Sequence, residues 1–286
     1  MADTPPAVLI TGATSGLGRY LAGQLAGSGW QVLAHGRDPA RVAELVAELG
    51  PELGPELGPE LGPELGGGAR GYVADLARLG DVRELAALVR AEVPRLDVLV
   101  NNAGIGFGAP GEGRQVSADG HELRFAVNYL APVLLTRLLV PLLTSSAPSR
   151  IVNVGSLGQV PFDPADAEFE DGYNGVDAYR RSKLALAAFT FGLAGELTAA
   201  EVTANCLHPA TFMDTAMVGR AGITPVSTVE QGGEATMRLI TDPALDAVTG
   251  QFFDGLRIAR ALPQAYDPQF RAELREVTDR MLSSAG

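Results

Sequence analysis

The stretch AVLITGATSGLG, Ala7–Gly18, decides the fold predicted for this chain. Its first four residues are apolar without polar alternation, which is typical of a strand buried on both faces of a parallel sheet. Gly12, Gly16 and Gly18 follow, and an apolar-periodic helix begins directly after them. Glycines at such a turn allow close backbone approach, and the helix N-terminus offers unpaired N–H groups to a phosphate. The stretch therefore predicts a strand–turn–helix unit that binds a nucleotide.

The second predicted strand, Trp30–His35, indicates which nucleotide the turn would hold. An NAD site places an acidic residue about 20 residues beyond the glycines, where it binds the ribose 2′-hydroxyl. Here Arg37 follows the strand, and Arg19 follows the last glycine. Asp38 is the competing candidate, but Asp-Pro before an apolar-periodic helix is typical of an N-cap. Because arginine binds phosphate bidentately, we expect NADP(H) in preference to NAD(H).

Apolar strands continue to alternate with helices along the rest of the chain. The further strands are expected at Arg70–Leu76, Leu96–Val100, Arg150–Ser156, Val202–His208 and Gly250–Phe253. The later helices are expected at Asp81–Val93, His121–Leu143, Asp177–Leu197, Thr228–Ile240 and Asp267–Leu282. This order predicts an α/β, single-domain Rossmann fold over residues 1–286: a doubly wound, seven-stranded parallel sheet with helices on both faces.

Composition restricts the class of partner and the compartment. The net charge of −12 argues against a nucleic-acid partner, because phosphate binding needs a basic surface. Cys206 is the only cysteine, so neither an internal disulfide nor a cysteine-rich metal site is expected. The N-terminus resembles no signal peptide, and Arg137 and Pro141 interrupt the most apolar run. We therefore expect a cytoplasmic protein with no membrane span and no metal.

A low-complexity repeat, GPELGPELGPELGPELG, runs from Gly50 to Gly66 and is followed by two more glycines. Proline and glycine in every four-residue unit exclude a continuous helix or a central strand. A docking stripe is one interpretation of the repeat. A dispensable surface loop over residues 50–68 is the interpretation that we favour.

The segment DAYRRSKLAL, Asp177–Leu186, places Tyr179 and Lys183 four residues apart. On a helix this spacing puts the phenol and the ammonium on one face. A phenol titrates near pH ~10, and a neighbouring cation favours the phenolate, which suits general acid–base chemistry. A snorkelling lysine beside a packed tyrosine is the alternative, because the spacing is common by chance.

Polar side chains also occur where buried strands end and inside an apolar helix. Asn101 to Gly104, NNAG, follow one strand, and Ser156 ends another. These positions match the carboxyl edge of an open α/β sheet, where ligands bind. Asn128 lies within the apolar run FAVNYLAPVLL, where asparagine is unfavourable unless it has a specific partner.

Together these motifs resemble the short-chain dehydrogenase/reductase family over nearly the whole chain. The matching motifs, in the family's order, are TGATSGLG at Thr11–Gly18, Asp75, NNAG at Asn101–Gly104, Asn128, Ser156, and Tyr179 with Lys183. The long stretch between Ser156 and Tyr179, with the Thr211–Ser227 loop, is similar to the retinol-dehydrogenase-like and protochlorophyllide-reductase-like branch.

The resemblance implies a catalytic set of four residues. Tyr179 would be the general acid that protonates a carbonyl oxygen, or the base in the reverse direction. Ser156 would hydrogen-bond the same oxygen. Lys183 would hold the nicotinamide ribose and lower the pKa of Tyr179, and Asn128 would hold a water in a proton relay.

The cofactor contacts are expected along the glycine turn and at the strand ends beside it. The candidates are Gly12, Thr14, Ser15, Gly16, Leu17, Gly18, Arg19, His35, Arg37, Asp75, Leu76, Asn102, Ala103, Gly104, Tyr179, Lys183, Pro209, Phe212 and Thr215. Asp75 would contact the adenine end, and Asn102 to Gly104 the adenosine side. The family's Pro-Gly after the sixth strand is Pro209-Ala210 here, and Thr215 lies one residue later than expected.

The loops expected above the nicotinamide are rich in aromatic residues and methionine. They carry Phe107, Phe162, Phe169, Tyr173, Phe212, Met213 and Met217. Such side chains suit a bulky apolar substrate, although several of them could instead pack the loops down. Residues 209–227 are expected to form a substrate loop that orders on binding.

We therefore expect an NADP(H)-dependent oxidoreductase that interconverts a carbonyl and an alcohol. The alternatives are an epimerase or dehydratase of the same superfamily, or a non-catalytic NAD(P)-sensing protein. Relatives are often dimers or tetramers, so we expect a homo-oligomer formed through the helices His121–Leu143 and Asp177–Leu197.

Overall fold

One eight-stranded sheet organises the computed structural model, which describes residues 4–50, 68–109, 111–197 and 201–284. The strand order is β3-β2-β1-β4-β5-β6-β7-β8. The strands are β1 (Ala7–Ile10), β2 (Gln31–Gly36), β3 (Ala69–Val73), β4 (Val98–Asn101), β5 (Ser149–Val154), β6 (Val202–His208), β7 (Phe252–Asp254) and β8 (Arg257–Ala259). Strands β1 to β7 are parallel, so the predicted doubly wound parallel sheet is confirmed.

The eighth strand was not predicted, and it runs antiparallel to β7. It has three residues and follows β7 after Gly255 and Leu256, with Gly255 at φ 56°. Parallel strands are separated by a long crossover, usually a helix, which marks them in the sequence. An antiparallel hairpin needs only two turn residues, so β8 has no such mark. The strand is also largely exposed, which removes the apolar pattern that marked the other seven.

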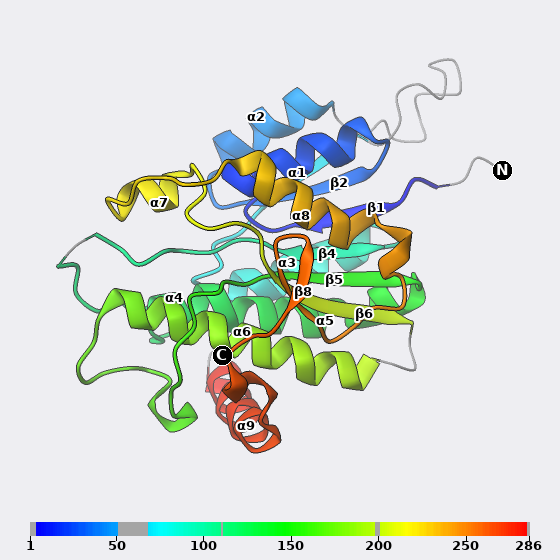
Figure 1. The fold of residues 1–286 in the computed structure, drawn as a ribbon. Helices are drawn as coiled ribbons and strands as arrows, with labels where there is room; N and C mark the ends of the chain where they lie inside the picture. Colours follow the sequence, from blue (N-terminus) through cyan, green and yellow to red (C-terminus); the bar gives the residue numbers. More distant parts are fainter. Residues whose placement is uncertain (1–3, 51–67, 110, 198–200, 285–286) are drawn as a thin grey trace, which may run out of the picture.

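Helices cover both faces of the sheet (Figure 1). One face packs against α1 (Gly16–Gly27), α2 (Pro39–Leu49) and α8 (Val229–Thr241). The other packs against α3 (Leu79–Glu92), α5 (Ala131–Ser145), α6 (Gly175–Leu197) and α9 (Pro268–Ser284). Leu9 of β1 belongs to the second core, whereas Val8 and Ile10 belong to the first. Successive side chains of such a strand point to opposite faces of the sheet, and a core covers each face. Every position is therefore apolar, which explains the continuous apolar runs.

The helix predicted at His121–Leu143 is divided into three parts. A short α4 (Leu123–Phe125) leads into a π-helical turn, η2 (Ala126–Leu130), and then into α5. Asn128 lies in the π turn with no exposed surface. Such turns are rare and are frequent at functional sites.

The predicted N-cap at Asp38 is confirmed. Its side chain accepts hydrogen bonds from the backbone N–H groups of Ala40 (2.9 Å) and Arg41 (3.4 Å), with Pro39 at the first helical position. The proline–glycine repeat Gly50–Gly66, predicted as part of a surface loop over residues 50–68, falls almost wholly on residues 51–67, which lie outside the described residues.

The continuous helix Leu123–Ser145 is long and apolar enough to cross a membrane by length and composition alone, with a mean hydropathy of 1.6. Arg137 and Pro141 interrupt the apolar run without ending the helix. Within this protein, 72% of the most apolar part of the helix is buried, and α5 packs against α3 and against β4 and β5. The cytoplasmic location, the absence of a membrane span and the homo-oligomer stay predictions.

Candidate active site

The glycine turn between β1 and α1 has the geometry of a backbone cradle. Gly12 and Gly16 adopt φ values of 67° and 49°, a left-handed region that side chains disfavour. A Cβ at Gly18 would lie 2.2 Å from the carbonyl oxygen of Gly12, so only glycine fits there. The N–H groups of Gly12 and Ala13 are used by His35, so the part of the turn suited to an anion is the N-terminus of α1.

Thr11 joins this turn to the carboxyl end of β4. Its Oγ1 accepts hydrogen bonds from the N–H groups of Asn102 (2.9 Å) and Ala103 (3.0 Å). In return, Asn102 Nδ2 donates to the Thr11 carbonyl at 2.8 Å. Thr11 is a site residue that the glycine motif did not predict, although it is the first residue of that motif. Its hydroxyl is what holds the two cofactor-side segments together.

His35 requires a correction to its predicted role in cofactor contact. Its Nδ1 accepts from Gly12 N–H (3.2 Å), and its Nε2 lies 3.1 Å from the Ala74 carbonyl, so Nε2 carries the proton. Burial lowers the pKa of His35 to about 4, which keeps the ring neutral. His35 is 2% exposed and both of its ring nitrogens are bonded. It therefore holds the backbone of Gly12 in place and contributes no charge to a phosphate site.

The predicted 2′-phosphate arginines lie beside α2 and directly before it. Arg37 is exposed directly after β2, and Arg19 forms ion pairs with Glu44 (3.2 Å) and Glu48 of α2. Sequence reasoning missed Arg41, whose Nη2 donates to the Thr14 carbonyl at 3.0 Å. An arginine one helical turn after Asp38 was the available signal.

The remaining cofactor candidates divide by exposure. Leu17 and Leu76 are 5% and 6% exposed and belong to the two cores, so their backbones alone could face a ligand. Asp75 is partly exposed, and its Oδ1 accepts from Ala77 N–H at 3.1 Å. Thr215 comes close to the glycine turn despite its shifted position, because its Cγ2 lies 3.2 Å from where a Gly16 Cβ would be.

Four more candidates complete the cofactor side. Thr14 is buried beneath the turn, whereas Ser15 is exposed at the N-cap of α1. Pro209 packs beside Gly232 of α8. Phe212 adopts φ 43° and is 39% exposed, so its ring projects from the 209–227 loop toward solvent.

Ser156, Tyr179 and Lys183 meet beyond the carboxyl end of β5. Ser156 follows this strand, and its Oγ accepts from Gly158 N–H at 3.0 Å. Tyr179 lies one turn before Lys183 on α6, and its hydroxyl is close enough to Ser156 for that side chain to lower the pKa of the phenol. The Lys183 Nζ lies 5.7 Å from the centroid of the Tyr179 ring and donates to the Val154 carbonyl at 2.8 Å. The structure therefore brings Ser156 together with Tyr179 and Lys183, which lie on a different segment of the sequence.

The pKa of Tyr179 differs in direction from the expectation. Burial raises it, and the hydrogen bond with Ser156 offsets only part of that rise. The neighbouring Lys183 is itself desolvated, and burial lowers its pKa to about 8. The isolated site therefore holds a protonated phenol at neutral pH, which is the form that donates a proton.

Asn128 links the loop after β4 to the helix that carries Tyr179. Its Oδ1 accepts from Ile105 N–H (2.8 Å), and its Nδ2 donates to the Ile105 carbonyl (3.0 Å) and to Ser182 Oγ (3.1 Å). Ser182 Oγ donates in turn to the Tyr179 carbonyl at 2.7 Å. The amide is thus fully engaged by protein groups, and its role in a water relay stays a prediction.

The same region has the chemistry to hold a dinucleotide. A Cβ at Gly104 would lie 3.2 Å from Asn128 Oδ1 and 3.7 Å from Lys183 Nζ, so backbone, amide and ammonium converge there. An ammonium has three donors, and Val154 accepts one of those of Lys183. The turn could hold a pyrophosphate, and Lys183 the hydroxyls of a ribose.

The apolar side chains predicted to contact substrate separate into two groups. Phe107 packs edge-to-face on Tyr179, with ring centroids 4.8 Å apart, and Met217 lies against Gly106. In contrast, Phe162 and Phe169 are each 6% exposed: Phe162 packs on Phe270, and Phe169 on the Arg181 guanidinium. The prediction is therefore wrong for Phe162 and Phe169, which fasten the loop to the core.

Two further members of that set also pack within the protein. Met213 lies against Gly232, and Tyr173 donates its hydroxyl to Glu122 at 3.0 Å. Their positions in the sequence gave no sign of these partners.

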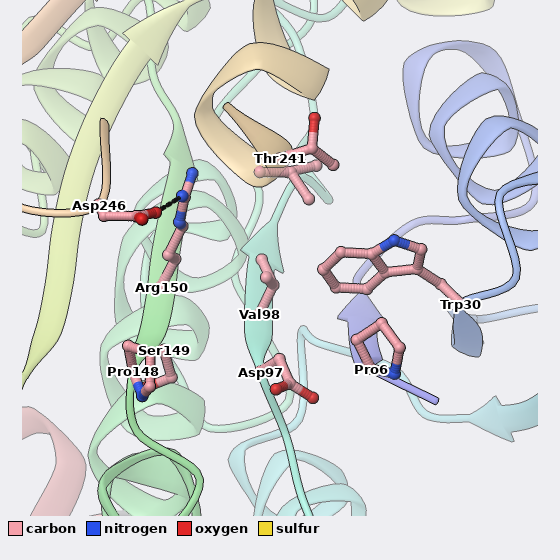
Figure 2. Close-up of a pocket in the computed structure, with 10 residues that line it drawn as sticks. Pro6, Trp30, Asp97, Val98, Pro148, Ser149, Arg150, Thr241 and Asp246 are labelled. Carbon is pink, nitrogen blue, oxygen red and sulfur yellow. Dashed lines mark hydrogen bonds and ion pairs between the residues drawn. The ribbon is translucent and has the colours of Figure 1, made fainter. Parts of the chain in front are cut away.

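A cavity of about 200 Å³ lies at the opposite, amino edge of the sheet (Figure 2). Trp30 and Pro6 line one side, and Arg150 and Asp246 line the other. Arg150 donates to the carbonyls of Leu239 (3.0 Å) and Asp242 (2.9 Å) and pairs with Asp246. The polar side chains of this cavity are bonded to other parts of the fold, and the cavity lies at the edge of the sheet opposite Tyr179.

Comparison with known proteins decides the family. The family model described as short chain dehydrogenase matches residues 6–224, which include the glycine turn, Ser156, Tyr179 and Lys183. The chain belongs to the short-chain dehydrogenase family. It is therefore an oxidoreductase that uses a nicotinamide cofactor.

The relatives of this short-chain dehydrogenase confirm the predicted retinol-dehydrogenase-like branch. Human retinol dehydrogenase 14 is 38% identical, over 96% of this chain and 85% of that protein. Human retinol dehydrogenase 13 is 32% identical, over 96% and 84%. Among solved structures, a short-chain dehydrogenase from Sphingobium yanoikuyae in complex with NADPH is 29% identical, with a TM-score of 0.63 over 81% of this chain and 83% of that one.

Proposed function

We propose that this short-chain dehydrogenase interconverts a carbonyl and an alcohol with NADP(H), and that Tyr179 is its general acid and base. The observation that supports this most is the meeting of the Ser156 and Tyr179 hydroxyls beside the buried Lys183 ammonium. These groups lie at the same sheet edge as the glycine turn. That edge is where open α/β sheets bind ligands.

The bound nicotinamide would supply or accept the hydride. Tyr179 would donate its proton to the carbonyl oxygen in reduction, since burial keeps the phenol protonated at neutral pH. The Ser156 hydroxyl would donate a second hydrogen bond to the same oxygen as negative charge develops there. Lys183 would hold the ribose with its unused N–H donors, and its charge would stabilise the phenolate left after proton transfer.

The arrangement around α2 supports NADP(H) over NAD(H). The Asp38 carboxylate accepts hydrogen bonds from the first turn of α2, so we do not expect it to bind the hydroxyls of an NAD ribose. Arg37 is exposed directly after β2, Arg41 donates to the Thr14 carbonyl of the glycine turn, and Arg19 lies in the first turn of α1, so three guanidinium groups are available to a 2′-phosphate. A guanidinium binds a phosphate more strongly than a neutral hydroxyl, so the preference follows from charge.

A bulky apolar compound is the proposed substrate. Phe107 lies against Tyr179, and the exposed Phe212 and Met217 belong to the 209–227 loop. The relatives include retinol dehydrogenases and a mouse polyprenol dehydrogenase, which is 32% identical over 97% of this chain and 84% of that protein. Retinol and polyprenols are both large apolar alcohols.

A titration of NADPH against NADH, followed by a carbonyl panel, tests this proposal. NADPH should bind about tenfold more tightly or better, because charge-assisted hydrogen bonds to the 2′-phosphate are lost with NADH. Tyr179→Phe should bind NADPH normally and lose turnover by about 10³, since it lacks the proton donor. Full turnover in that variant would refute the assignment of Tyr179.

A further inference from the structure

The guanidinium of Arg124 is a buried cation that the proposed reaction does not use. Its side chain is 3% exposed. Nε donates to the Gly106 carbonyl (2.9 Å), Nη2 to the Phe107 carbonyl (2.9 Å) and Nη1 to the Tyr173 hydroxyl (2.6 Å). Arginine alone offers such a rigid fork of donors. Arg124 therefore clamps two successive carbonyls of the loop after β4.

Two carboxylates balance this charge. Glu122, which is 1% exposed, places Oε1 3.6 Å from Arg124 Nη1 and caps α4 by accepting from Phe125 N–H at 2.7 Å. The Tyr173 hydroxyl bridges the pair, and burial raises its pKa to about 12, so it stays protonated. Glu112 lies 3.8 Å from Nη2 on the outer side. The cluster is thus satisfied electrostatically before any ligand binds.

The clamped loop touches the candidate catalytic phenol. Phe107 packs edge-to-face on Tyr179 at 4.8 Å. A Cβ at Gly175 would lie 2.1 Å from the Phe107 carbonyl, so the start of α6 rests on this residue one turn before Tyr179. Ile105 is held from both sides by Asn128. Arg124 and Asn128, one turn apart, therefore fix three successive loop residues.

We propose that Arg124 is a positioning residue that holds Phe107 as the apolar wall beside the Tyr179 hydroxyl, and that this wall favours bulky apolar carbonyl compounds over small ones. The inference rests on the proposed function of Tyr179. Arg124 itself contacts the backbone of the wall and not the reacting atoms. The Phe107 ring lies against the Tyr179 ring, and its place depends on the two clamped carbonyls.

Arg124→Lys tests the proposal, because lysine keeps the charge beside Glu122 and loses the fork. The readout is the ratio of kcat/KM for a long-chain polyene aldehyde to that for propanal. The ratio should fall about tenfold or more, as expected when an apolar pocket loses complementarity. The Kd for NADPH should stay within about twofold, because no cofactor-side group is changed. An unchanged ratio would overturn the proposal.

Phe107→Leu supplies the second arm. If Arg124 acts through Phe107, the double variant should show the ratio of Phe107→Leu alone, because the two positions are coupled. Independent, multiplicative effects on the ratio would refute the mechanism. Arg150→Lys is the matched control, since it loses the fork onto Leu239 and Asp242 at the other edge of the sheet. Its substrate ratio should equal that of the wild type.

Tyr173→Phe covers the case in which Arg124→Lys does not fold. It removes only the hydroxyl between Arg124 and Glu122, so the ratio should shift in the same direction by a smaller factor. If neither Tyr173→Phe nor Phe107→Leu changes the ratio, the proposal is wrong. Wild-type protein without Tyr179-dependent turnover would overturn the proposed function and this inference together, whereas normal turnover with unchanged ratios would overturn the inference alone.

Discussion

Arg124 and Arg150 occupy opposite edges of the same sheet and make nearly the same contacts. Each donates to two backbone carbonyls and pairs with a carboxylate. Arg150, at the amino end of β5, binds the last carbonyls of α8, where a cation also complements the helix dipole. Arg124 binds loop carbonyls that adjoin Tyr179. The two guanidinium groups make the same kind of contact. The role of each arginine depends on the segment whose carbonyls it binds.

The two edges also differ in how their charges are satisfied. At the amino edge, Arg150 and Asp97 are hydrogen-bonded within the fold, and Figure 2 shows the pair of Arg150 with Asp246. At the carboxyl edge, burial lowers the pKa of Lys183 to about 8 and raises that of Tyr179. Perturbed ionisable groups of this kind concentrate at functional sites. The comparison therefore predicts losses of activity at one edge and losses of stability at the other.

Ser156→Ala and Ser149→Ala give the largest contrast, because both serines lie near the ends of β5. Ser156→Ala should reduce kcat by about 10²–10³, the usual effect of removing one donor to a developing oxyanion. Ser149→Ala, which loses a hydrogen bond to the Leu143 carbonyl, should cost about 1 kcal/mol of stability and no activity. Steady-state kinetics and urea unfolding measure the two effects. Equal kcat values in both variants would break the comparison.

Lys183→Met should abolish turnover and stabilise the protein without cofactor. The folded pKa of about 8 lies below the ordinary 10.5, so charging Lys183 costs on the order of 3 kcal/mol at most. This cost is present in full below pH 8 and disappears as the pH rises toward 10.5. The wild type should therefore gain stability between pH 8 and 10, and the variant should lack that gain. The measurement is the Tm of each protein across this pH range. If the Tm of the two proteins changed with pH in the same way, the prediction would be wrong.

Arg150→Lys should lower stability by about 1–2 kcal/mol through its lost hydrogen bonds to Leu239 and Asp242. Its kcat/KM should stay unchanged, because the amino edge is remote from Tyr179. Chemical denaturation and kinetics on the same preparation measure both. A selective loss of activity would show that this edge communicates with the site.

Asp246→Asn should have the smallest effect. The Asp246 side chain is 65% exposed, so its ion pair with Arg150 is screened and worth less than about 1 kcal/mol. The two carbonyl acceptors keep Arg150 in place. Unfolding at low and at high salt should show the difference shrinking as salt rises. A loss as large as that of Arg150→Lys would mean that the ion pair, and not the carbonyls, anchors the arginine.

The sequence alone determined the parts of this protein that depend on neighbours along the chain. The apolar runs gave seven strands whose bounds lie within three residues of the observed ones. Asp38 before Pro39 gave the helix cap, and the four-residue spacing gave Tyr179 and Lys183 on one face. Periodicity, capping and glycine conformations are local properties, so they can be read without a fold.

Only the tertiary structure decided burial and distant partners. It turned His35 from an expected cofactor contact into the support of Gly12, because its partners come from the turn after β1 and from the residue after β3. It reversed the pKa direction of Tyr179, because desolvation outweighs a lysine that is itself buried. It also placed Arg124 against Phe107 and Tyr173, which lie 17 and 49 residues away. Desolvation and long-range contacts exist only after the chain has folded, so no local pattern could reveal them.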